Sequence, residues 1–217
     1  MGKKQKILLR LAVYALGTVT LALGIVLNTK TGMGTSAIIS VPYAISVAGK
    51  WDLGRVTFFF YVFCVLMQWV LNRKGFRVWE WLQLAVSFVT SGCIGIFDRC
   101  IPMASEGLAA RFFVLALAIM ATGVGSSLIV MMELVSNPAD GLARAVGKLA
   151  GREFGFGKNV LDLACVLTAV GIGLLCCGRI VGIGVGTICS AIFIGRCIAL
   201  TDRLFRRPIR QAAGLVG

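Results

Sequence analysis

Six apolar segments, each close to the length of a helix that crosses a bilayer, constrain this chain of 217 residues more than any other feature. A spanning helix needs about 20 apolar residues, because the hydrocarbon core is about 30 Å thick and a helix rises about 1.5 Å per residue. The six segments are 7–27, 53–71, 78–97, 112–132, 156–177 and 180–200. The sequence therefore predicts an all-α polytopic membrane protein with six long transmembrane helices.

The composition supports the same class. Hydrophobic residues make up 58% of the chain and charged residues 14%, whereas soluble domains carry roughly 25% charged residues. The chain has 22 basic and 9 acidic residues. Because the basic residues lie between the apolar segments, they favour anionic membrane lipid over nucleic acid as the partner, and we expect no nucleic-acid binding.

The residue inventory also limits the chemistry. Histidine is absent, which removes the commonest general base and the commonest metal ligand. The 8 cysteines form no C-x-x-C pair, and we interpret them as small membrane-buried residues rather than as disulfides or a metal site. We therefore expect no enzyme, no cofactor and no metal. Since no ATP-binding motif is present, active transport would need an ion gradient or a separate energising subunit.

Two further apolar segments, 35–49 and 137–150, are too short to cross the hydrocarbon core fully. They occupy equivalent places in two halves of the chain. A shift of 101 residues aligns 35–37 with 136–138 and 64–66 with 165–167, and a shift of 104 aligns 98–99 with 202–203. We interpret residues 1–217 as a single membrane domain of two homologous repeats, about 7–100 and 108–203, with a basic cytoplasmic tail over 204–217.

The short segments leave two topologies open. If they are re-entrant, each half has three spans and the halves are inverted, whereas if they barely span, the chain has eight spans in two parallel halves. Their length favours inversion. In both cases most basic residues lie on the side of the termini, so the positive-inside rule places both termini in the cytoplasm. We expect the first segment to stay attached as a signal anchor.

Three short motifs resemble those of the bacterial YczE/YyaS/YitT family of integral membrane proteins. They are GMGTS at 32–36, SNPADG at 136–141 and GVGT at 184–187, and the likeness extends from about Ala15 to Arg203. In that family a G-T-S-P-x-D-like motif opens each short helix. The second half keeps Pro138 and Asp140, whereas the first half has Ala37 and Ile39 where the proline and the aspartate would be expected. The resemblance implies a multi-pass protein of the bacterial cytoplasmic (inner) membrane and supplies no reaction.

The N-terminal ends of the two short segments form the predicted substrate site. Paired short helices in equivalent positions of two repeats mark the binding site of many transporters. The unpaired N–H groups at such helix ends favour a polar or anionic solute. The predicted substrate-binding residues are Thr35, Ser36, Ser136, Asn137, Asp140 and Arg144.

Asp140 has two interpretations that the sequence leaves open. A charge at membrane depth usually faces a cavity or a partner, and Arg144 lies one turn further along the same helix. Asn137, however, is a typical N-cap, and a carboxylate three residues later simply favours the positive helix end. Lys158 and Asp162 are also four residues apart, and this spacing predicts an ion pair that either gates the site or only neutralises both charges.

These features favour a permease or transporter-like protein for a small polar or anionic solute. The alternative is a membrane protein that regulates or scaffolds other proteins without moving a solute, and an intramembrane enzyme ranks third. Four arginines follow the last predicted span, and we expect them to bind anionic lipid: Arg203, Arg206, Arg207 and Arg210. A homo-oligomer is compatible with the sequence.

Overall fold

The structure is a computed structural model that describes residues 2–73, 75–104 and 107–215. Its helices, in chain order, are α1 (Lys3–Lys30), α2 (Ala37–Gly49), α3 (Leu53–Leu71), the 3-10 helix η1 (Val78–Trp81), α4 (Leu82–Cys100), α5 (Leu108–Met131), α6 (Pro138–Leu149), α7 (Phe154–Cys177) and α8 (Val185–Ala212). The described residues contain no strand, and six helical segments are long and apolar enough to cross a membrane. The prediction of an all-α, multi-pass membrane protein is confirmed.

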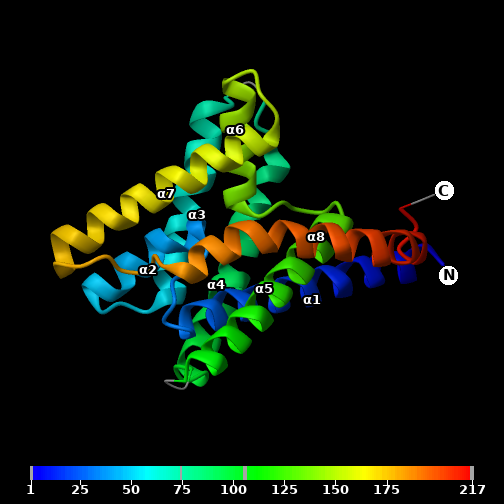
Figure 1. Cartoon of the computed structure of the whole chain (residues 1–217). Coiled ribbons are helices and arrows are strands. Elements are labelled where there is room, and N and C mark those ends of the chain that lie inside the picture. The colour runs from blue at the N-terminus through cyan, green and yellow to red at the C-terminus, as the bar shows by residue number, and fades with distance from the viewer. Residues whose placement is uncertain (1, 74, 105–106, 216–217) are drawn as a thin grey trace.

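Helices α1 and α5, the first helices of the two predicted halves, pack against each other in opposite directions (Figure 1). Near the start of α1, the Arg10 guanidinium donates a hydrogen bond of 2.8 Å to the carbonyl oxygen of Met132, just after α5. Further along α1, a Cβ on Gly24 would lie 2.5 Å from the backbone nitrogen of Thr122, so the two backbones nearly touch. Inverted halves require these opposite directions, whereas parallel halves would require α1 and α5 to run the same way.

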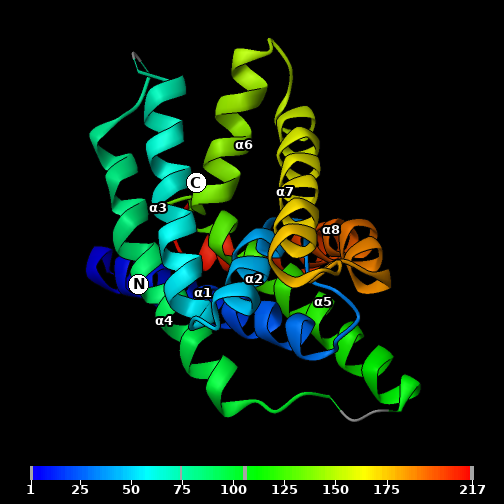
Figure 2. The same cartoon turned by 90° about the vertical axis from the view of Figure 1, so that its left-hand side faces the viewer.

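The second and third helices of both halves form a four-helix cluster. α2 packs on α3 and α7, and α6 packs on the same two helices, so the short helices lie at opposite corners of a ring. Figure 2 shows α3, α6 and α7 running side by side, with α2 at their lower end. Across the α2–α7 contact, the Ser40 hydroxyl donates to the carbonyl oxygen of Cys165 at 3.3 Å.

Helix α6 differs from the apolar segment predicted over 137–150. Its Leu142 and Ala143 are buried, whereas Arg144 and Lys148, one turn apart, are exposed on another face. The helix begins where the sequence predicts an N-cap: the Asn137 side chain accepts a hydrogen bond from the backbone N–H of residue 139. The second short helix is therefore amphipathic, because its charged residues share one face of the helix.

The last long helix begins later and ends later than the predicted span over 180–200. The preceding linker turns at Gly178 and Gly182, whose φ angles of 65° and 74° are readily adopted only by glycine. The carbonyl oxygen of Gly182 accepts a hydrogen bond of 2.8 Å from the Thr35 backbone, which ties this linker to the α1–α2 loop. α8 then continues to Ala212, so most of the basic tail predicted over 204–217 is helical; residues 216 and 217 lie outside the described part.

Candidate functional site

An open cavity of about 200 Å³ lies between α6 and the hairpin formed by α3 and α4. Its deepest side chains are Gln68 of α3 and Gln83 of α4, which are 3% and 2% exposed. Its rim carries the exposed Arg144 and Lys148 of α6. The remaining lining residues are Asn72, Glu80, Ser136, Gly141 and Ala145. We call this the glutamine cavity.

The two glutamines bond to each other through both amide groups. Gln68 Nε2 donates to Gln83 Oε1 at 3.1 Å, and Gln83 Nε2 donates back to Gln68 Oε1 at 3.2 Å. Gln68 Nε2 also donates to the carbonyl oxygen of Pro138 at 2.9 Å, which anchors the first turn of α6. A Cβ on Gly141 would collide with the Gln68 amide. A larger residue at this position would therefore displace the Gln68 amide from the pair.

The charges around the glutamine cavity favour an anion. Arg144 and Lys148 bring two positive charges to the rim, and Glu80 brings one negative charge. Lys148 Nζ donates to Asn72 Oδ1 at 3.2 Å, and the Arg144 guanidinium lies 5.9 Å from the centre of the Phe154 ring. An arginine held by an aromatic ring keeps its planar donor edge available for a carboxylate or phosphate.

Asp140 lies beside a different cation than the sequence spacing indicates. Lys158 Nζ of α7 is 3.9 Å from Asp140 Oδ1 and 3.3 Å from Asp162 Oδ1. One lysine thus bridges two carboxylates on neighbouring helices, and we call these three residues the Asp–Lys–Asp triad. The predicted Lys158–Asp162 ion pair is present, whereas Arg144, the expected partner of Asp140, turns to Phe154 and the glutamine cavity.

A second, smaller cavity lies between α2 and the linker before α8. It measures about 180 Å³ and is lined by Tyr43, Val47 and residues 179–182. Because Lys148 near the end of α6 reaches Asn72 just after α3, the start of α7 lies near the end of α3. The glutamine cavity is therefore at one end of the four-helix cluster, and the second cavity is at the other, where α7 ends.

The structure brings only part of the predicted substrate site together. Ser136 and Arg144 line the glutamine cavity. Asp140 belongs to the triad and lies one turn before Arg144 on α6. Thr35 is buried in the contact between the α1–α2 loop and the linker before α8, and Ser36 is the N-cap residue of α2 but makes no side-chain capping bond. Neither residue lines either of the two cavities.

Sequence reasoning missed the glutamines. Gln68 and Gln83 are polar residues inside apolar segments, and such residues usually find a partner on another helix. That signal was available, but their mutual contact depends on how α3 and α4 pair.

The 8 cysteines are all free, with Cys64 and Cys165 buried and Cys100 and Cys176 exposed. Within the described residues, no group of three potential metal-ligating side chains is found.

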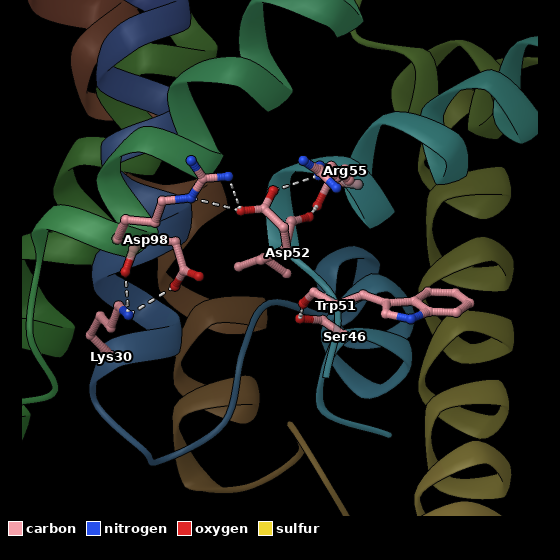
Figure 3. Close-up of polar contacts among 9 residues, drawn as sticks. Lys30, Ser46, Trp51, Asp52, Arg55 and Asp98 are labelled. Carbon is pink, nitrogen blue, oxygen red and sulfur yellow. Dashed lines mark hydrogen bonds and ion pairs between the residues drawn. The ribbon is translucent and has the colours of Figure 1, made fainter. Parts of the chain in front are cut away.

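A second set of ion pairs joins the ends of α1 and α4 to the α2–α3 turn (Figure 3). Lys30 Nζ lies 2.9 Å from Asp98 Oδ1, and Arg99 Nη2 lies 2.7 Å from Asp52 Oδ2. Burial raises the pKa of Asp52, but the hydrogen bonds and charges of Arg99 and Arg55 outweigh this effect, so the pKa lies below its ordinary value. The cluster fixes the start of α3, because Asp52 Oδ1 also accepts from the Arg55 backbone at 3.0 Å.

Comparison with known proteins places the chain in a family. The model of a family described as "Family of unknown function (DUF6198)" matches residues 8–203. The chain belongs to this family. The search of the curated proteins gave no match. The search of the solved structures gave none either. In this DUF6198 protein the match covers both short helices and all or most of each of the six long apolar helices, and its description assigns no reaction.

Proposed function

We propose that this protein is a permease for a small anionic solute, and that the glutamine cavity is its binding site. The observation that supports this proposal is a cavity with two buried amides at its base and two cationic side chains at its rim. Gln83 uses one of its two amide N–H groups on Gln68, and no hydrogen bond within the described residues engages the other. The other group can donate to a carboxylate or phosphate oxygen.

The arrangement of the helices supports movement of a solute rather than binding alone. The two cavities lie at opposite ends of the cluster of α2, α3, α6 and α7, and each borders one of the short helices. Inverted halves would place them on opposite sides of the membrane, as alternating access requires. On this proposal the chain is related to the YczE/YyaS/YitT family, lies in the bacterial cytoplasmic membrane and has both termini in the cytoplasm.

Ligand-dependent thermal stability of the purified protein tests the binding site. The probes are phosphate, sulfate, acetate and succinate, with glycerol and ethylammonium as uncharged and cationic counterparts. At least one anion should raise the melting temperature of the wild type but not of Arg144→Gln or Lys148→Gln. Arg152→Gln, which removes an exposed positive charge outside both cavities, is the matched control and should respond like the wild type.

Uptake into proteoliposomes then separates the candidate functions. The stabilising anion should accumulate in vesicles that contain the wild type and not in vesicles that contain Arg144→Gln. Binding without uptake would favour the regulatory or scaffold protein, with the cavity as its ligand sensor. No stabilisation by any probe would exclude these anions as ligands and refute the cavity as their binding site.

A further inference from the structure

The Asp–Lys–Asp triad carries an unbalanced charge. Asp140 and Asp162 contribute two negative charges, and Lys158 contributes one positive charge. Asp162 lies about 12 Å along α7 from the first residue of that helix, so the excess charge is well inside a membrane-spanning helix. A charge at such depth is costly unless a partner neutralises it.

The side chains around the triad do not supply the missing charge. From α3, Tyr61 lies near Asp140, and on α7 Cys165 lies near Asp162 with Cys64 of α3 beside it. Helix α2 contains no Asp, Glu, Lys or Arg, and its Tyr43 faces the linker before α8. The positive charges of α6, Arg144 and Lys148, line the glutamine cavity instead, and Arg144 lies over the Phe154 ring.

We propose that the Asp–Lys–Asp triad binds one proton, and that this proton controls anion binding in the glutamine cavity. One carboxylate oxygen forms an O–H bond with a proton taken from water, and the net charge of the triad changes from −1 to zero. A metal cation fits less well, because the Lys158 ammonium group already occupies the space between the carboxylates, at 3.9 and 3.3 Å. The side chains are 29–32% exposed, so they are not enclosed by the protein.

Helix α6 connects the proton site to the anion site. Asp140 and Arg144 lie one turn apart, about 6 Å along the helix axis. An ionised Asp140 lowers the positive potential at the rim, and protonation of the triad removes this effect. Anion binding should therefore strengthen when the triad is protonated, and by reciprocity a bound anion should favour the proton. This coupling rests on the proposed function, whereas the proton site itself does not.

Infrared difference spectroscopy between acidic and alkaline pH tests the proton site in the full-length protein reconstituted in lipid. The wild type should show one membrane-embedded carboxyl group that gains a C=O stretch as the pH falls. In Asp140→Asn and Asp162→Asn the triad is neutral without a proton, so this band should be lost from both variants. Asp202→Asn, which removes a carboxylate of α8 outside the four-helix cluster, should keep it.

Anion affinity as a function of pH tests the coupling. The ligand is the anion that raises the melting temperature of the wild type. The dissociation constant of the wild type should fall by up to about tenfold per pH unit of acidification, as expected for one coupled proton. It should change little in either Asp→Asn variant. Glu80→Gln removes the acid of the cavity itself and should retain the pH dependence.

The outcomes distinguish failure of this inference from failure of the proposed function. A carboxyl band that is absent from the wild type, or that persists in both Asp→Asn variants, overturns the proton site even if uptake is observed. A band that behaves as expected without any anion binding supports the proton site and refutes the coupling together with the proposed function. A wild-type affinity that is independent of pH refutes the coupling alone.

Discussion

Replacing Gly157 by alanine should separate α6 from α7. A Cβ at this position would overlap the carbonyl oxygen of Ala143 and would lie 2.6 Å from the backbone nitrogen of Gly147, about 0.8 Å short of ordinary contact at 3.4 Å. Both obstacles are backbone atoms, so a rotamer change cannot relieve the overlap. Overpacking of this kind costs about 1–3 kcal/mol, and alanine recovers about 0.5–1 kcal/mol of helix propensity. We expect a net loss of about 1–2 kcal/mol.

Thermal unfolding in detergent measures this loss. A soluble domain of this length shifts by about 2–4 °C per kcal/mol, so the melting temperature should fall by roughly 2–8 °C. Gly171→Ala on the same helix is the matched control, because its Cβ would meet no other atom within 4 Å. It should be neutral or slightly stabilising. If Gly157→Ala were as stable as Gly171→Ala, the close α6–α7 contact that positions Asp140 beside Lys158 would be refuted.

Three further predictions concern the ends of the helices. Asp52→Asn should lower the stability of the protein most above about pH 4. The lowered pKa of Asp52 stabilises the fold above the unfolded-state value of about 3.9, and this contribution is lost on acidification. Unfolding measured as a function of pH tests this, and a stability difference between variant and wild type that is the same at all pH values would contradict it. The double variant Arg203→Gln and Arg207→Gln should weaken binding of phosphatidylglycerol by about 2 kcal/mol, roughly 30-fold, and native mass spectrometry of retained lipid measures this, with equal retention contradicting the lipid contact. In a chain without its native cysteines, an impermeant thiol reagent on intact cells should label Trp51→Cys but not Arg152→Cys, and protection of both would favour eight spans.

The sequence predicted the fold class well because the bilayer imposes a length on each apolar segment. That reasoning was insufficient for α6, which was predicted as an apolar segment but is an amphipathic helix with Arg144 and Lys148 on one face. It was also insufficient for α8, because the turns at glycines in the preceding linker place the start of this helix at Val185 rather than at residue 180. Segment length predicts that a helix exists, whereas its bounds and faces depend on turns and neighbours.

The candidate site was less predictable, because contacts between helices form it. The spacing of Lys158 and Asp162 indicated their ion pair, since residues four apart face each other on any helix. The addition of Asp140 depends on how closely α6 approaches α7, and local spacing carries no information about that distance. Gln68 and Gln83 likewise meet only because α3 and α4 pair as a hairpin.

The antiparallel contact between α1 and α5 has a consequence for synthesis of the chain. The glycine-bearing face of α1 packs on a helix that begins at Leu108, so the contact cannot form until α5, the first helix of the second half, has left the ribosome. Until then Gly17 and Gly24 lack the helix that covers them in the folded protein. The first half therefore completes its packing only after α5 of the second half is made. A chain that stops after α4 would present an uncovered face of α1 to the membrane's quality-control proteases.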